Sequence, residues 1–233
     1  MGVFAPALVA IALTWYNAGS AARDALLGRT LAWSVGWRCY AFAVLFFPLA
    51  RLLAAAVHRA ALGTWPAFAA ESLPIMIVAT IVSAPVQAGE EIGWRGFLLP
   101  RLAARVGLPA ASILTGIVWA AWHLPFFVLP GSDKTGQPFP AYLAAVTALS
   151  VAMAWLYWRT GGSLLLTMIM HAAVNNLRPV STPSMSGSPF DVAAPFISWA
   201  GVGVMWVAAA WLLVAMRGAT LTIEAPSARP GSA

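Results

Sequence analysis

Long apolar segments constrain the fold of this chain more than any other feature of its sequence. We expect about seven of them to span a bilayer, because each approaches the roughly 20 apolar residues that a membrane-crossing helix needs. They cover approximately residues 3–18, 31–52, 73–89, 109–129, 140–158, 162–179 and 194–216. Within lipid, a segment has to satisfy its backbone hydrogen bonds internally, which favours helices. The sequence therefore predicts an all-α, polytopic transmembrane helix bundle.

The composition supports this class of protein and argues against a nucleic-acid partner. Hydrophobic residues make up 61% of the chain and charged residues only 9%, whereas soluble domains carry about 25% charged residues. The formal net charge of +6 comes from basic residues that are scattered singly between apolar segments. Such residues are typical of the loops that orient a membrane protein, so we expect membrane lipid, and no nucleic acid, around this chain.

The basic residues of alternate connectors also predict an orientation. The larger set is Arg23, Arg29, Arg95, Arg101, Arg105, Arg159, Arg217 and Arg229, and the smaller set is Arg51, Arg59, Lys134 and Arg178. The positive-inside rule makes the side of the larger set cytoplasmic, with the N-terminus outside and the C-terminus inside. Since arginine far outnumbers lysine and alanine is abundant, we expect a multi-pass protein of a bacterial plasma membrane.

Polar residues and glycines mark the connectors between the segments. We expect a polar turn around Arg23-Asp24, a loop at 63–66 and a basic connector that contains Arg101 and Arg105. Arg38 falls inside the second segment, where it can snorkel to the interface or pair. The first segment lacks the basic region and cleavage site of a secretory signal peptide, so we expect it to be retained.

The chain is thereby divided into four parts. These are N-terminal transmembrane helices (1–72), a core (73–180), a loop with the last transmembrane helix (181–217), and a polar tail (218–233) that is expected to be disordered and cytoplasmic.

Two adjacent carboxylates, Glu90 and Glu91, lie at the end of the third apolar segment. An ionisable side chain in such a place costs a few kcal/mol or more, so it is normally paired or functional. In a helix Glu91 and Arg95 lie four residues apart on one face, which predicts an ion pair. Glu90 points about 100° away. We therefore expect Glu90 to be unpaired and able to act as a general base.

Two further polar clusters lie in later apolar segments. His123 follows Trp119 in the fourth segment, and His171 and Asn175 lie four residues apart in the sixth. Each cluster alone is often a hydrogen-bonded packing feature. Together with Glu90 they predict a hydrolytic site, because a carboxylate and an imidazole can activate water. A second imidazole and a carboxamide can stabilise an oxyanion.

Other kinds of site are less well supported by the sequence. There is no His-Glu-x-x-His motif for a zinc protease and no pair of intramembrane aspartates. Zinc bound by Glu90, His123 and His171 has acceptable ligand types and stays open as an alternative to a cofactor-free mechanism. Five aromatic residues can line an apolar substrate groove, although ordinary packing is the commoner role: Trp94, Trp119, Trp122, Phe126 and Phe127.

The motifs in their order resemble those of a known family. Glu90-Glu91-x-x-x-Arg95, an aromatic-x-x-x-His from Trp119 to His123, and His171-x-x-x-Asn175 are similar to the three motifs of the CPBP (ABI) intramembrane proteases, which include the CAAX prenyl endopeptidases. The resemblance covers about residues 73–180. One departure is Trp119, where the family pattern usually has Phe.

The resemblance implies a fold, an activity and roles for the site residues. The fold is a membrane bundle whose cavity opens to the cytoplasmic leaflet, and the activity is that of a glutamic endopeptidase without a metal. Glu90 with His123 would activate water, His171 and Asn175 would form the oxyanion hole, and Glu91 with Arg95 would orient the helix. A peptide or membrane-protein substrate is implied. Members of the family described as immunity proteins keep a non-proteolytic membrane role, as an immunity factor or scaffold, as the alternative.

Overall fold

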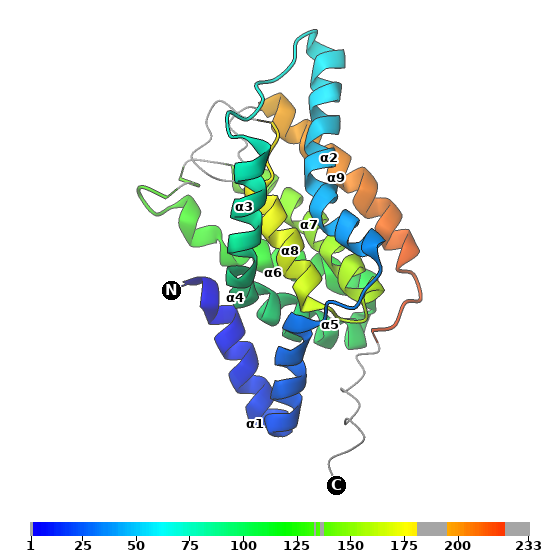
Figure 1. Ribbon diagram of the computed structural model, residues 1–233. Coiled ribbons are helices and arrows are strands. Elements are labelled where there is room, and N and C mark those ends of the chain that lie inside the picture. The colour runs from blue at the N-terminus through cyan, green and yellow to red at the C-terminus, as the bar shows by residue number, and fades with distance from the viewer. Residues whose placement is uncertain (1, 133, 136–137, 181–194, 222–233) are drawn as a thin grey trace.

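The computed structural model describes residues 2–132, 134–135, 138–180 and 195–221, and these form a bundle of helices (Figure 1). The helices are α1 (Ala5–Gly28), α2 (Trp37–Leu62), α3 (Leu73–Ser83), α4 (Ala88–Glu91), α5 (Leu99–Val106), α6 (Leu108–Trp122), α7 (Phe139–Arg159), α8 (Leu164–Asn176) and α9 (Pro195–Ala215). The predicted all-α class is confirmed. The part of the expected polar tail beyond residue 221 lies outside the described residues.

Several helical stretches are suited to a membrane. Over the described ranges, five are long and apolar enough to cross one, namely Gly2–Leu31, Trp37–Leu62, Leu73–Val106, Phe139–Arg159 and Phe196–Ala215. The helices α6 and α8 are apolar but shorter. These seven stretches correspond to the seven apolar segments predicted from the sequence, and they make the chain a multi-pass membrane protein.

The third stretch is one helical run with a change of winding in its middle. A 3₁₀ turn (Ala84–Gln87) separates α3 from α4, and a π-helix (Ile92–Leu98) separates α4 from α5. The predicted connector at Arg101 and Arg105 is wrong, since both residues lie in α5. Pro100 does not end the run because a helix tolerates proline in its first turn; the run ends at Gly107, with φ 77°.

The helix α1 bends sharply at Gly19, so that its two halves form a V (Figure 1). Gly19 has φ 79° and ψ −177°, a backbone conformation that glycine adopts at little cost. The predicted polar turn at Arg23-Asp24 is therefore wrong. Both residues lie on the second helical half, and they pair with each other at 2.8 Å.

Arg38 lies inside the second candidate span, Trp37–Leu62, as predicted, but in its first turn. The helix α2 begins only at Trp37, because Gly36 before it has extended backbone (φ −61°, ψ 144°). Arg38 is exposed in the first turn, and its guanidinium lies over the Trp37 ring at 5.8 Å from the centroid.

The helix α7 forms the centre of the bundle, and it is buried along most of its length. It lies against α6 so closely that a Cβ on Gly116 would come within 2.7 Å of the Cα of Thr147. The Ser150 hydroxyl donates a hydrogen bond of 2.9 Å to the Ser112 carbonyl across the same contact. Small residues of this kind let membrane helices approach closely, and the contact fixes α6, whose C-terminal end carries His123.

A second close contact joins α1 to the helical run that carries the two glutamates. A Cβ on Gly89 would lie 2.6 Å from the carbonyl oxygen of Val3, and a Cβ on Gly93 would lie 2.5 Å from the Cβ of Pro6. Gly89 and Gly93 have the Gly-x-x-x-Gly spacing that presents bare backbone on one helix face. The glutamates therefore sit next to a face that the N-terminal helix covers.

Candidate active site

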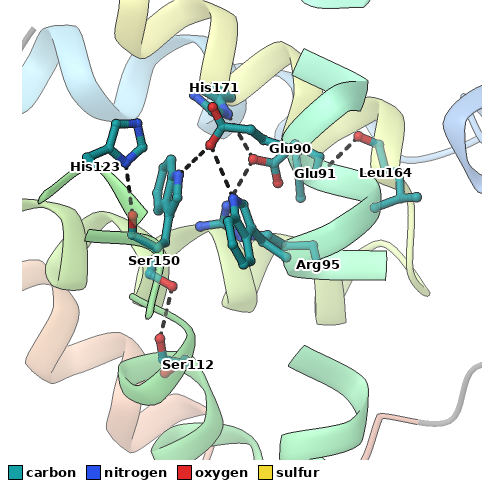
Figure 2. A network of polar contacts seen from close by, with 11 residues as sticks. Glu90, Glu91, Arg95, Ser112, His123, Ser150, Leu164 and His171 are labelled. Carbon is teal, nitrogen blue, oxygen red and sulfur yellow. Dashed lines mark hydrogen bonds and ion pairs between the residues drawn. The ribbon is translucent and has the colours of Figure 1, made fainter. Parts of the chain in front are cut away.

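The polar residues predicted from the sequence come from three elements that meet inside the bundle. Glu90 and Glu91 lie on α4, His123 directly follows α6, and His171 lies on α8. Figure 2 shows the side chains of Glu90, Glu91 and His171 pointing toward one another. Both histidines interact electrostatically with Glu90. The tertiary structure thus brings together residues up to 81 positions apart along the chain, from Glu90 to His171.

Glu91 and Arg95 form the predicted ion pair, with Arg95 Nη1 donating to Glu91 Oε1 at 2.9 Å. Both side chains are fully buried. The same oxygen also lies 2.8 Å from Nδ1 of His171, a contact that the sequence did not predict. Because a carboxylate accepts and does not donate, this Nδ1 carries a proton. Glu91 therefore links α4 to α8.

Glu90 is not the unpaired carboxylate that its helical position predicted. Its Oε2 accepts hydrogen bonds from the indole N–H groups of Trp94, at 3.1 Å, and Trp119, at 2.6 Å. Neutral indole donors satisfy one carboxylate oxygen without adding a charge. In the described part of the chain no side chain or backbone group donates to Oε1, so that oxygen is open to a ligand.

One ring nitrogen of His123 is hydrogen-bonded to the protein, and the other is available to a ligand. Its Nδ1 lies 2.9 Å from the backbone carbonyl oxygen of Trp119. A carbonyl only accepts, so Nδ1 is protonated, and in the neutral imidazole Nε2 is then an acceptor. The half-buried ring stacks beside Tyr142, with centroids 5.6 Å apart. This arrangement makes Nε2 a suitable partner for a water molecule.

Glu90 and His123 line one cavity of about 480 Å³. Its other lining residues are Gly2, Val3, Ala121, Trp122, Pro125, Phe126 and Lys134. The cavity is therefore largely apolar, with a carboxylate, an imidazole and an ammonium group on its walls. Ligand sites in proteins commonly combine apolar walls with a few polar groups in this way.

Arg95 has only one of its nitrogens in a hydrogen bond with a described residue. Nε and Nη2 are buried without a hydrogen-bond partner there. The guanidinium instead lies over the Trp119 ring, with Cζ 4.3 Å from the ring centroid. An aromatic face at this distance stabilises a buried cation. Trp119 and Glu91 therefore both stabilise the charge of Arg95.

Asn175 lies one turn after His171 on α8, as its spacing predicted, but it is not among the residues that line the cavity. It is half-buried, and no described residue hydrogen-bonds to its amide. The next residue, Asn176, donates to the Ser83 hydroxyl and to the Ala172 carbonyl oxygen, both at 2.8 Å. Asn176 thus ties the end of α8 to α3 and leaves the Asn175 amide available.

The described residues do not assemble the alternative zinc site. No three side chains of His, Cys, Asp or Glu among them are grouped so that they could hold a metal ion. Among the three proposed ligands, Glu90 Oε2 accepts from two N–H donors. Nδ1 of His123 and Nδ1 of His171 are each committed to another acceptor.

The five aromatic residues take different places. Trp122 and Phe126 line the cavity with Glu90 and His123. Trp94, Trp119 and Phe127 are buried. Phe127 packs against Tyr142 at a centroid distance of 5.1 Å.

The sequence analysis did not predict the roles of three residues at the site. Trp94 and Trp119 hold Glu90, and Lys134 lines the cavity. The four-residue spacing from Glu90 to Trp94 is the same as that from Glu91 to Arg95, and it was a usable signal for a side-chain contact. No local signal places Trp119 or Lys134, since both reach the site through the tertiary fold.

Fold and site define a class, a multi-pass membrane protein with a buried glutamate–histidine site open to an apolar cavity. Residues 69–177 match the family model described as type II CAAX prenyl endopeptidase Rce1-like. Over these residues, the match confirms the resemblance to the CPBP proteases. The matched segment contains all the motif residues from Glu90 to Asn175.

A curated relative is similar to part of the chain. It is the CAAX prenyl protease 2 of Methanococcus maripaludis, which is 25% identical over 114 residues, or 46% of this chain and 41% of that protein. The chain thus spans about two fifths of the length of this relative.

Proposed function

We propose that this protein is an intramembrane endopeptidase that hydrolyses a peptide bond with water activated by Glu90 and His123. The observation that carries the proposal is that both side chains line one apolar cavity. Each has one polar atom that makes no hydrogen bond with a described residue. Those atoms are Glu90 Oε1 and His123 Nε2. A carboxylate and an imidazole that can both reach one water molecule are the parts that general-base hydrolysis requires.

In the proposed reaction, Nε2 of His123 accepts one hydrogen of the water molecule and orients it. Oε1 of Glu90 removes the other proton as the water oxygen bonds to the carbonyl carbon of the scissile peptide. The C=O π electrons move to the carbonyl oxygen, which gives a tetrahedral oxyanion. When the oxyanion collapses, the C–N bond breaks and the proton on Glu90 passes to the leaving amine. Glu90 is thereby regenerated as a carboxylate.

The oxyanion is assigned to His171 and Asn175. Nδ1 of His171 already donates to Glu91, so Nε2 can donate to an oxyanion only when the ring is doubly protonated. Two buried carboxylates face the single cation of Arg95, and a buried excess of negative charge is costly. A protonated His171 leaves the cluster of Glu90, Glu91, Arg95 and His171 neutral.

The substrate is inferred to be a peptide segment in or at the membrane. Apolar walls around the glutamate suit an apolar stretch of polypeptide. The family description refers to an endopeptidase and the name of the Methanococcus relative to a protease, which agrees with a peptide substrate.

The test compares wild type with Glu90→Gln by terminal-peptide proteomics of membranes, with both proteins inserted at equal levels. Glu71→Gln is the matched control, because Glu71 is an exposed carboxylate outside the site. New peptide termini that require Glu90 but not Glu71 support the proposal and name the substrate. If Glu90→Gln retains both the termini and the physiological effect of the wild type, the protein acts without this chemistry, as a membrane immunity factor or scaffold.

A further inference from the structure

Trp119 contacts four polar residues of the site through its indole N–H, its backbone carbonyl and its ring. Its indole N–H donates to Glu90 Oε2 at 2.6 Å, and its backbone carbonyl accepts from His123 Nδ1 at 2.9 Å. Its ring face lies 4.3 Å from Cζ of Arg95, and the ring of His171 stands edge-on at a centroid distance of 5.1 Å. With 3% of its surface exposed, Trp119 is locked in this position.

The two indole donors act on the same oxygen of Glu90. Trp94 reaches Oε2 from one turn along the helix, whereas Trp119 reaches it from α6. Two donors from different elements leave the carboxylate little freedom to rotate. In an apolar interior each of these charge-assisted hydrogen bonds is stronger than in water. The consequence is that Oε1, and not Oε2, is the oxygen available for proton transfer.

We propose that Trp119, together with Trp94, is a positioning residue that fixes Glu90 so that Oε1 faces the water molecule beside His123. The inference rests on the proposed function, because it assigns the orientation of the general base in that reaction. The indole N–H is the group of Trp119 that fixes the orientation of the Glu90 carboxylate. The backbone carbonyl of Trp119 holds His123 whatever side chain stands at position 119, and an aromatic ring without N–H can still stack on Arg95.

The inference is tested with two replacements that remove the N–H group. Trp119→Phe removes it together with part of the ring, and 3-benzothienylalanine at position 119 replaces it with sulfur while the bicyclic shape is kept. With a cleavable peptide in proteoliposomes, we expect kcat to fall about 10- to 100-fold for both, the range for loss of a hydrogen bond to a charged group. KM should stay within about twofold, since Trp119 is not a cavity-lining residue.

Trp155→Phe is the matched control. Trp155 packs on Phe42 with ring centroids 4.6 Å apart, away from the glutamates, so its loss should leave kcat unchanged. A benzothienyl variant with wild-type kcat would overturn the inference and show that Trp119 only fills space. A variant that changes KM alone would overturn it as well. Glu90→Gln in the same membranes distinguishes failure of the positioning role from failure of the proposed function. Activity in that variant would contradict the proposed function itself.

Discussion

Nδ1 of His171 lies 2.8 Å from Oε1 of Glu91, the same oxygen that accepts from Arg95. Two N–H donors on one carboxylate oxygen connect the ion pair of the first motif to the histidine of the third. The contact means that Glu91 has two roles, since it neutralises Arg95 and also accepts a hydrogen bond from Nδ1 of His171. The consequences for stability and for catalysis can be measured separately.

Glu91→Gln is expected to destabilise the fold. The substitution leaves the fully buried guanidinium of Arg95 without its counter-charge, and breaking one partner of a buried pair costs about 3–5 kcal/mol. We expect a lower thermal midpoint in detergent and a reduced yield of monodisperse protein. The double variant Glu91→Leu/Arg95→Met should recover part of the loss, because it removes both charges. A single variant as stable as wild type would show that the pair contributes little.

His171→Gln is expected to impair catalysis more than stability. Glu91 keeps its bond to Arg95 in this variant, while the oxyanion loses a donor. Removal of one such donor typically lowers kcat about 100- to 1,000-fold. Single-turnover cleavage in proteoliposomes measures the effect, with the thermal midpoint as the check on folding. Wild-type kcat in His171→Gln would remove His171 from the proposed oxyanion hole.

Asn175→Ala tests the second oxyanion donor. The amide hydrogen-bonds to no described residue, so its removal should leave the thermal midpoint nearly unchanged. If Asn175 binds the oxyanion, kcat falls by a similar factor of about 100 to 1,000. Asn176→Ala is the matched control. It removes the hydrogen bond to Ser83 and should therefore lower the thermal midpoint rather than kcat. Unchanged kcat in Asn175→Ala would assign the oxyanion to other groups.

Gly93→Val is expected to displace α1. A Cβ at position 93 would lie 2.5 Å from the Cβ of Pro6 and 2.8 Å from its carbonyl carbon, and backbone cannot yield cheaply at such distances. We expect increased proteolysis of the N-terminal helix and a lower thermal midpoint. Gly203→Val is the control, since nothing lies within 4 Å of its Cβ position. Equal protease resistance of the two variants would contradict the close contact.

Metal dependence separates the two mechanisms for the same reaction. If water is activated by Glu90 and His123 alone, activity survives dialysis against chelator, and purified protein that contains far less than one zinc per chain by mass spectrometry still cleaves. The zinc alternative predicts stoichiometric metal and loss of activity that zinc restores. Glu90→Gln would then also lower the bound zinc content, which the metal-free mechanism does not predict.

The sequence by itself determined the class of fold and the local pairs. Runs of apolar residues are long enough to require helices in lipid, because the backbone has no other partner there. The ion pair of Glu91 and Arg95 followed from helical spacing, because residues four apart share a face in any helix. The orientation with the N-terminus outside and the roles of the site residues stay predictions.

The tertiary structure alone decided which groups meet across helices and where the helices change course. The local sequence predicted neither the bend at Gly19 nor the helical continuation through Arg101. Glu90 was expected to be unpaired, yet Trp119 reaches it from 29 residues away. A buried carboxylate such as Glu90 has to accept hydrogen bonds. The packing of α6 in the bundle determines that the indole N–H of Trp119 is one of the donors.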